Sequence, residues 1–84
     1  MPYIKKEDRV KCDSNLQKLG EHINTEGELN YCITKLLHLF VEKHGVNYKN
    51  LSKCIGGVEC AKLEFYRRIV SPYEDMKMVE NGDV

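Results

Sequence analysis

The sequence predicts an all-α protein. Helix start and stop signals recur along its 84 residues, apolar residues return at three- and four-residue steps, and the period-two alternation of strands is absent. These signals define an antiparallel two-helix hairpin over about 25–44 and 47–70, with short helical segments before it and a short helix over about 72–80. We expect a single helical domain over residues 1–84, because no linker, repeat or low-complexity segment divides the chain.

The first part of the chain predicts two short helical segments. Residues 5–11 fit a first short turn of helix. Asp13 is a good N-cap for a following segment that carries Leu16, Leu19 and Ile23 on one face. Gly20 makes that segment less regular.

Thr25 and Glu28 predict the start of the first long helix as a capping box, in which each residue satisfies an amide at the helix start. Gly45 predicts its end, as the left-handed residue after the last turn. Between them runs one apolar stripe, made of Leu29, Cys32, Ile33, Leu36, Leu37 and Phe40.

Asn47 predicts the start of the second long helix as its N-cap, with Val46 and Leu51 placed for a hydrophobic staple. The link between the two long helices is about two residues, which favours an antiparallel hairpin. The buried face is predicted to hold Leu51, Cys54, Ile55, Val58, Ala61, Phe65 and Ile69.

Two adjacent glycines, Gly56 and Gly57, interrupt this helix at a cost of about 2 kcal/mol relative to alanines. With Cys60 and Ala61 they form two small-residue pairs four residues apart, which would let another helix approach closely. The alternative is a kink or break at the same point. The first interpretation makes Gly56, Gly57, Cys60 and Ala61 a candidate oligomer interface.

Pro72 predicts that the second long helix ends near Val70, because proline disfavours helical geometry in the residue before it and clashes within a continuing helix. Ser71, Pro72 and Glu74 then fit the cap, first and third positions of a new helix. Asn81 and Gly82 predict its end.

Composition excludes several classes of protein. Thirteen basic and thirteen acidic residues cancel, which removes the long-range attraction on which sequence-independent binding to duplex nucleic acid depends. The start of the chain lacks the apolar core of a signal peptide, and no apolar run is long enough to span a membrane. We expect a cytoplasmic protein of bacterial or viral origin, with no membrane partner.

A chain of this length buries only about 60–65% of its unfolded surface, so a monomer would be marginally stable. We therefore expect a homo-oligomer. Four cysteines, Cys12, Cys32, Cys54 and Cys60, show no paired spacing, and we interpret them as small apolar core residues rather than disulfides or metal ligands.

The densest group of candidate binding residues lies near Pro72. Glu64 precedes Arg67 and Arg68 by three and four residues, which favours ion pairs along a solvated helix face. The alternative is that one arginine clamps an anion, with Tyr66 and Tyr73 as stacking groups. The predicted helix start at Ser71 would add free backbone amides to that anion site.

A second candidate group, Asn30 and Tyr31 with Thr34, forms a polar strip beside the apolar stripe of the first long helix. It would line a pocket if the hairpin pairs with another copy. Acidic residues and histidines lack the spacing of a metal site, and no serine or cysteine has an activating context. We expect no catalytic residue, no metal and no cofactor.

Two blocks of sequence carry a resemblance: Gly27-Glu-Leu-Asn-Tyr31-x-Ile-Thr34, and Glu64-Phe-Tyr-Arg-Arg68 continuing through Pro72-Tyr-Glu-Asp75 to Asn81-Gly-Asp-Val84. The chain resembles a family of small bacterial and phage proteins that is known as a domain of unknown function. The resemblance runs from Pro2-Tyr3-Ile4 to the last residue and implies no established activity. In outline, a short helix before a hairpin is also similar to small phage proteins that sequester immune signalling nucleotides.

We therefore expect a non-enzymatic, homo-oligomeric helical binding protein whose ligand is a phosphate-bearing small molecule, such as a nucleotide. The first alternative is a protein-interaction adaptor that presents Tyr66, Tyr73, Met76 and Met78 to a partner chain. The second is a metal-dependent enzyme that acts on nucleotides.

Overall fold

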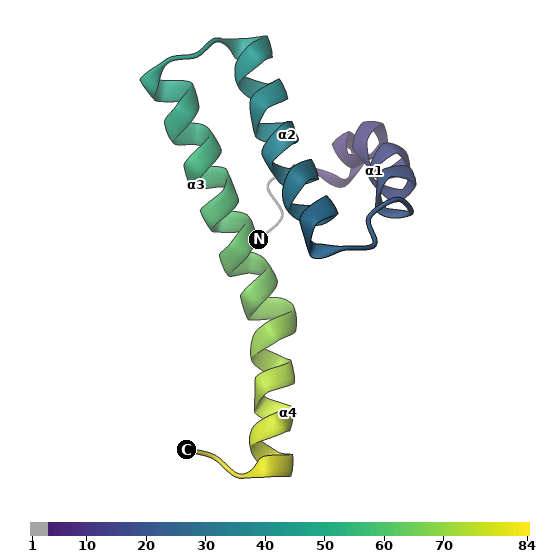
Figure 1. The fold of residues 1–84 in the computed structure, drawn as a ribbon, viewed down its shortest axis with the longest axis vertical. Coiled ribbons are helices and arrows are strands. Elements are labelled where there is room, and N and C mark those ends of the chain that lie inside the picture. The colour runs from purple at the N-terminus through teal and green to yellow at the C-terminus, as the bar shows by residue number, and fades with distance from the viewer. Residues whose placement is uncertain (1–3) are drawn as a thin grey trace. The chain divides into compact units, whose positions relative to one another are not determined.

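This computed structural model describes residues 4–84, and the predictions that fall on Met1–Tyr3 lie outside the described residues. Every regular element in the described range is helical (Figure 1): α1 (Lys6–Gly20), α2 (Glu26–His44), α3 (Tyr48–Phe65), η1 (Tyr66–Val70) and α4 (Ser71–Asn81). The predicted all-α fold is confirmed. The chain forms two compact units, Met1–Lys43 and His44–Val84, and each is described by itself.

The first unit opens with one helix, α1, where the sequence predicted two segments. Asp13 does not cap a helix, because it lies in the interior of α1. No glycine or proline stands between residues 5 and 19, and an aspartate inside a helix costs less than about 0.7 kcal/mol. Gly20 is the last residue of α1, and Ile23 lies beyond its end.

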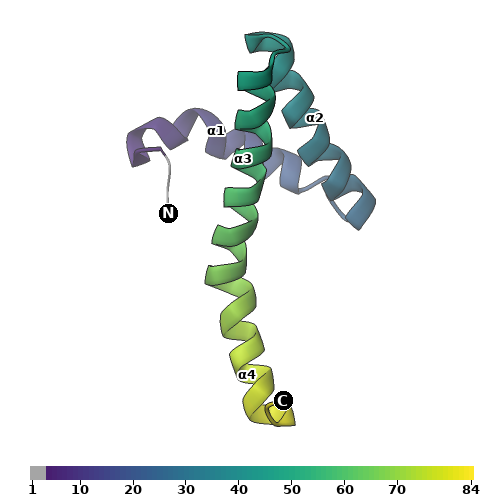
Figure 2. The same ribbon diagram turned by 90° about the vertical axis from the view of Figure 1, so that its left-hand side faces the viewer.

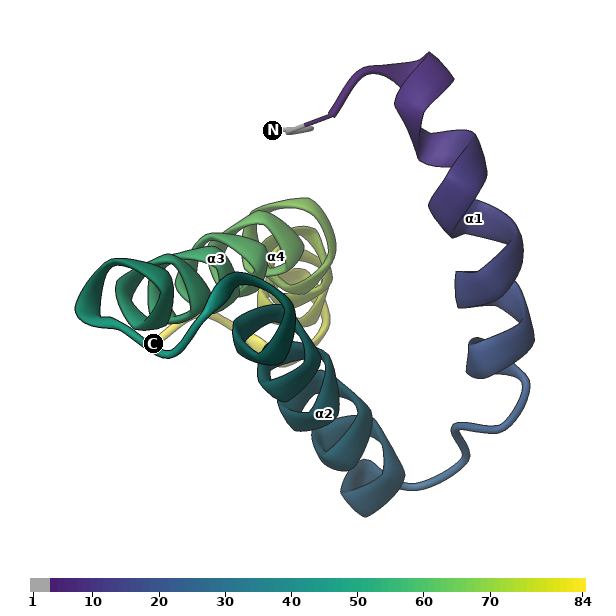
Figure 3. The same cartoon turned by 90° about the horizontal axis from the view of Figure 1, so that it is seen from above.

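The capping box predicted at the start of α2 is present, with one difference. The Glu28 N–H donates to Thr25 Oγ1 over 3.1 Å, as expected, whereas Glu28 Oε1 accepts from the Asn24 N–H over 3.0 Å. The hydrogen bond from the Asn24 N–H, followed by a hydrogen bond between the Thr25 side chain and the carboxyl group, lowers the pKa of the Glu28 carboxyl. Figure 3 shows α1 and α2 leaving the link between them in different directions.

The second unit begins with a tight turn around Asn50, the only buried side chain among the described residues. Asn47 caps α3, as predicted, because Asn47 Oδ1 accepts from the Asn50 N–H over 2.9 Å. The Asn50 amide donates to the carbonyls of His44 and Gly45, each over 3.0 Å. Gly45 has φ +108°, the positive φ that its predicted role requires.

From Tyr48 onward, α3, η1 and α4 form one continuous helix of 34 residues, which we call the long helix (Figure 2). The predicted break before Pro72 is a π-helical turn instead. The Ser71 N–H donates to the carbonyl of Tyr66, five residues earlier, and Ser71 keeps helical angles. The wider turn accommodates a proline without ending the helix.

No apolar side chain is buried among the described residues. The prediction that the four cysteines fill a core is therefore wrong for this chain: Cys12 and Cys60 are exposed, and Cys32 and Cys54 are half-buried. The stripes predicted to form buried faces are present as helical stripes, but their apolar side chains are largely open to solvent. The antiparallel pairing of α2 with α3 stays a prediction, since the two helices belong to different units.

Over the described residues, none of the helices is long and apolar enough to cross a membrane.

Candidate functional site

The π turn η1 holds three of the predicted ligand-binding residues, Tyr66, Arg67 and Arg68. Single π turns inside α-helices are often found at functional sites. The turn brings these residues next to Glu64 in the last turn of α3 and Glu74 in the first turns of α4. The π turn therefore gathers two arginines, two carboxylates and a phenol within one short stretch of helix.

Both arginines bind the same carboxylate oxygen. Arg67 Nη2 lies 2.6 Å from Glu64 Oε1, and Arg68 Nε donates to that oxygen as well. The Glu64 side chain is 23% exposed, whereas the arginine side chains are mostly open to solvent. The predicted ion pairs are thus present, and two positive charges share one negative charge.

Tyr66 is held by a carboxylate on the other side of the π turn. Its hydroxyl donates to Glu74 Oε1 over 2.6 Å. This hydrogen bond raises the pKa of the Tyr66 phenol, and repulsion by the Glu74 charge adds to the effect. Tyr66 therefore stays protonated at neutral pH, and its hydroxyl is used within the helix.

The predicted anion site at the start of a new helix is wrong. Ser71 is an internal helical residue whose N–H is already bonded to Tyr66, so no free helix start exists there. Glu74, expected to close a capping box with Ser71, binds Tyr66 instead. Any anion would depend on the arginine side chains alone.

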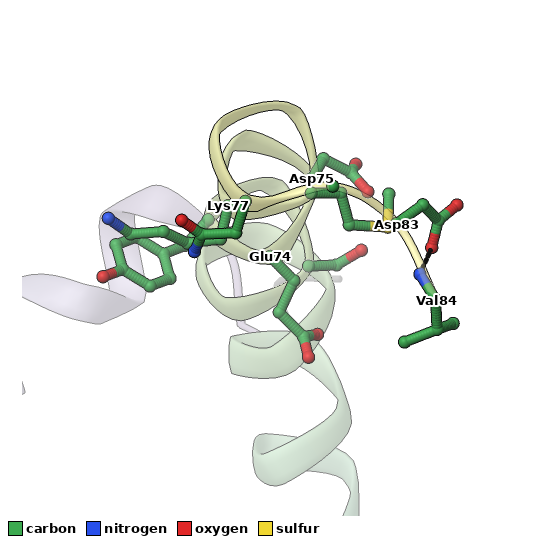
Figure 4. A pocket seen from close by; sticks show the side chains of 10 residues that line it. Glu74, Asp75, Lys77, Asp83 and Val84 are labelled. Carbon is green, nitrogen blue, oxygen red and sulfur yellow. Dashed lines mark hydrogen bonds between the residues drawn. The ribbon is translucent and has the colours of Figure 1, made fainter.

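Tyr73 lies on α4 with Lys77, whose ammonium is 5.5 Å from the centre of the Tyr73 ring. Figure 4 shows side chains that line an open hollow along this helix, among them Glu74, which accepts from Tyr66, and Asp83, which accepts from the Val84 N–H. Gly82, with φ +88°, starts the tail that leaves α4. The hollow is lined by Ser71, Tyr73, Glu74, Asp75, Lys77, Met78, Asn81, Gly82, Asp83 and Val84.

The second predicted group lies in the first unit, at the start of α2. Thr34 Oγ1 donates to Asn30 Oδ1 over 3.3 Å, and Tyr31 is largely exposed beside them. Together with Glu26 and Gly27 these residues line an open hollow. The structure thus brings Asn30, Tyr31 and Thr34 together, as the sequence predicted for one helix face.

The candidate interface residues lie along α3. A methyl group added at Gly56 or Gly57 would meet no neighbouring atom within 4 Å, so both positions are open. Cys60 is exposed, and Ala61 falls at the edge of the apolar stripe. Helical spacing places Gly56, Gly57 and Cys60 on the face away from the stripe. Their role in an interface stays a prediction.

Asn50 is the structural residue that the sequence analysis missed. The signal was present, because Asn50 stands three residues after the Asn47 cap, the position from which a side chain can reach back to the turn. Among the described residues, no group of three or more histidine, cysteine, aspartate or glutamate side chains is placed to hold a metal ion.

The comparisons with known proteins identify a family and no function. No curated protein and no solved structure matches the chain. A family described as "Domain of unknown function (DUF6899)" matches residues 1–84, so the expected resemblance to an uncharacterised family is confirmed. The chain belongs to this family of unknown function.

Proposed function

We propose that this chain is a non-enzymatic, homo-oligomeric helical binding protein that folds fully only when copies of it associate. The observation that carries the proposal is that no apolar side chain between residues 4 and 84 is buried. A sequence with 42% hydrophobic residues has the composition of a protein with a core.

The apolar stripe of the long helix is the exposed surface that we propose for self-association. It is built at helical spacing from Leu51, Ile55, Val58, Phe65 and Ile69, and all five side chains are exposed. Residues of these types are normally buried in stable proteins, and exposed patches of them mark interaction surfaces.

The first experiment measures self-association of the purified chain by analytical ultracentrifugation. We expect an oligomer that Ile69→Asp weakens at least tenfold, because a carboxylate on the stripe would be buried at the interface. Leu63→Asp is the matched control: Leu63 and Ile69 are each 56% exposed in the single chain, but Leu63 lies away from the stripe.

A monomeric wild-type chain would overturn the proposal and favour an adaptor whose partner is a different protein. A stronger effect of Leu63→Asp than of Ile69→Asp would instead assign the interface to the face that holds Gly56 and Gly57.

A phosphate-bearing ligand is a second candidate function, and the paired arginines favour it. Arg67 and Arg68 share one oxygen of Glu64, and both guanidinium groups remain mostly exposed. Guanidinium groups bind phosphate in a bidentate manner, so a nucleotide phosphate would compete with Glu64 for them.

A thermal-shift screen over nucleotides tests this second function. We expect a stabilising nucleotide whose effect is lost in Arg68→Ala, with helicity unchanged. Lys62→Ala is the control, because Lys62 is an exposed cation that pairs with Glu59 on the same helix. Equal stabilisation of wild type and Arg68→Ala would remove Arg68 from the site.

A further inference from the structure

We infer that the end of α4 is a modification site, at which Asn81 deamidates through a cyclic imide formed with the backbone nitrogen of Gly82. Opening of the last turn of α4 controls the rate. The reaction consumes water and needs no enzyme. This inference goes beyond the proposed function and does not depend on self-association.

Asn81 differs from the other asparagines of the chain in the residue that follows it. Five other asparagines occur in the chain: Asn15, Asn24, Asn30, Asn47 and Asn50. Each of them precedes a leucine, a threonine or a tyrosine, whereas Asn81 precedes Gly82. A side chain on the following residue hinders the approach of its backbone nitrogen to the asparagine amide, and glycine has no side chain and permits more backbone conformations. Ring closure is therefore least hindered at Asn81.

Ring closure forms a bond between the Gly82 nitrogen and the side-chain carbonyl carbon of Asn81. The Gly82 N–H gives its proton to hydroxide, and the side-chain nitrogen of Asn81 takes a proton from water and leaves as ammonia. Water then opens the imide at one of its two carbonyls. Opening at the side-chain carbonyl gives aspartate, and opening at the main-chain carbonyl gives isoaspartate, whose backbone runs through the side chain.

The fold places this pair of residues where the helix ends. Asn81 is the last residue of α4, and Gly82 leaves the helix with φ +88° and ψ 144°. Figure 1 shows the tail turning away from the helix at this point. Both residues are exposed, so hydroxide and water reach them.

One backbone hydrogen bond restrains the attacking nitrogen. The Gly82 N–H donates to the carbonyl of Met78 over 2.9 Å. This bond holds the proton that must leave, and it keeps the Gly82 nitrogen from turning toward the Asn81 side chain. Helix ends fray, and such local openings cost little free energy. The last turn of α4 therefore slows the reaction without preventing it.

The products weaken the same turn. Each product places a new carboxylate between Glu80 and Asp83, at the C-terminal end of a helix, where the helix dipole disfavours negative charge. Isoaspartate also lengthens the backbone before Gly82 by one carbon, which shifts the Gly82 N–H away from the Met78 carbonyl. Modification therefore releases the tail that lines part of the hollow along α4.

The first test incubates the folded chain at mildly alkaline pH and maps its peptides by mass spectrometry. Conversion of Asn81 to the acid should be roughly tenfold or more faster than conversion of any other asparagine, because only Asn81 precedes a residue without a side chain. Gly82→Ala should slow it by a similar factor. Alanine at φ +88° also strains the helix end, so a slower reaction in this variant reports the added side chain and not a tighter helix.

Asn81→Gln is the matched control, because glutamine keeps the amide and closes a six-membered ring far less readily. It should remove the product at position 81 and leave the other asparagines unchanged. Equal rates at Asn81 and at the other asparagines would overturn the modification site.

The second test measures the restraint by the last turn. Unfolding in guanidinium chloride should speed conversion of Asn81 roughly two- to tenfold over the folded chain in sodium chloride of the same ionic strength, the factor that loss of one backbone hydrogen bond produces. Equal rates would overturn control by the last turn while leaving the site itself intact.

The third test measures the effect of the product charge. Asn81→Asp should lower the protection of the Gly82 N–H from hydrogen exchange, whereas Asn81→Gln should preserve it. Unchanged protection in Asn81→Asp would overturn the inferred release of the tail by the added charge.

Discussion

Asn50, the one buried side chain among the described residues, holds the turn between α2 and α3 together. Asn50 is 8% exposed, and its side-chain amide and backbone N–H together make three hydrogen bonds in the turn that leads into α3. Two of these bonds reach the carbonyls of His44, the last residue of α2, and of Gly45 just after it. Asn50 thus joins the end of one helix to the start of the next.

We predict that Asn50→Ala lowers the free energy of unfolding by about 1–3 kcal/mol, because it removes both hydrogen bonds that the Asn50 amide donates in the turn. Urea unfolding followed by circular dichroism at fixed protein concentration measures the change. Asn15→Ala, at an exposed position in α1, should change the value by less than about 0.5 kcal/mol. Equal effects of the two substitutions would contradict the role given to Asn50.

At the scale of elements, the long helix combines a proline and two glycines that each weaken a helix. The π turn accommodates Pro72, and Tyr66 binds Glu74 across it. The surroundings of Gly56 and Gly57, by contrast, are open in the single chain. The helix stability that the two glycines cost therefore has two explanations. The glycines contact another copy of the chain, or they make the helix locally flexible.

Gly57→Ala separates these two explanations. The substitution should stabilise the isolated helix by about 1 kcal/mol, since alanine is the better helix former and the added methyl group meets nothing. If the small-residue face contacts another copy, the same substitution should weaken self-association. Thermal unfolding and ultracentrifugation of one variant give both values, and stabilisation with unchanged association would remove Gly57 from the interface.

Local signals in the sequence predicted the elements well, because caps act within a few residues of the helix end. Thr25, Asn47 and Gly45 perform their predicted roles, and Glu64 pairs with both arginines. Pro72 misled the prediction, since a proline that usually ends a helix is accommodated here by a wider turn. The anion site at Ser71 depended on that break and is lost with it.

At the scale of the whole molecule, the sequence does not predict which surface covers the apolar stripes. Periodicity identifies a face such as that of Leu51 and Phe65, but it does not say whether the same chain or another buries it. The prediction that the cysteines fill a core assumed that the chain buries its own apolar faces. The single chain leaves Cys12 and Cys60 exposed.

The placement of two thiols provides an internal chemical reporter. Cys54 lies on the apolar stripe and is half-buried, whereas Cys60 is exposed about 120° away around the helix axis. If copies associate through the stripe, alkylation of Cys54 should slow as protein concentration rises, while Cys60 should keep reacting at a constant rate. The ratio of the two alkylation rates, measured by mass spectrometry on the wild-type chain, therefore follows its self-association.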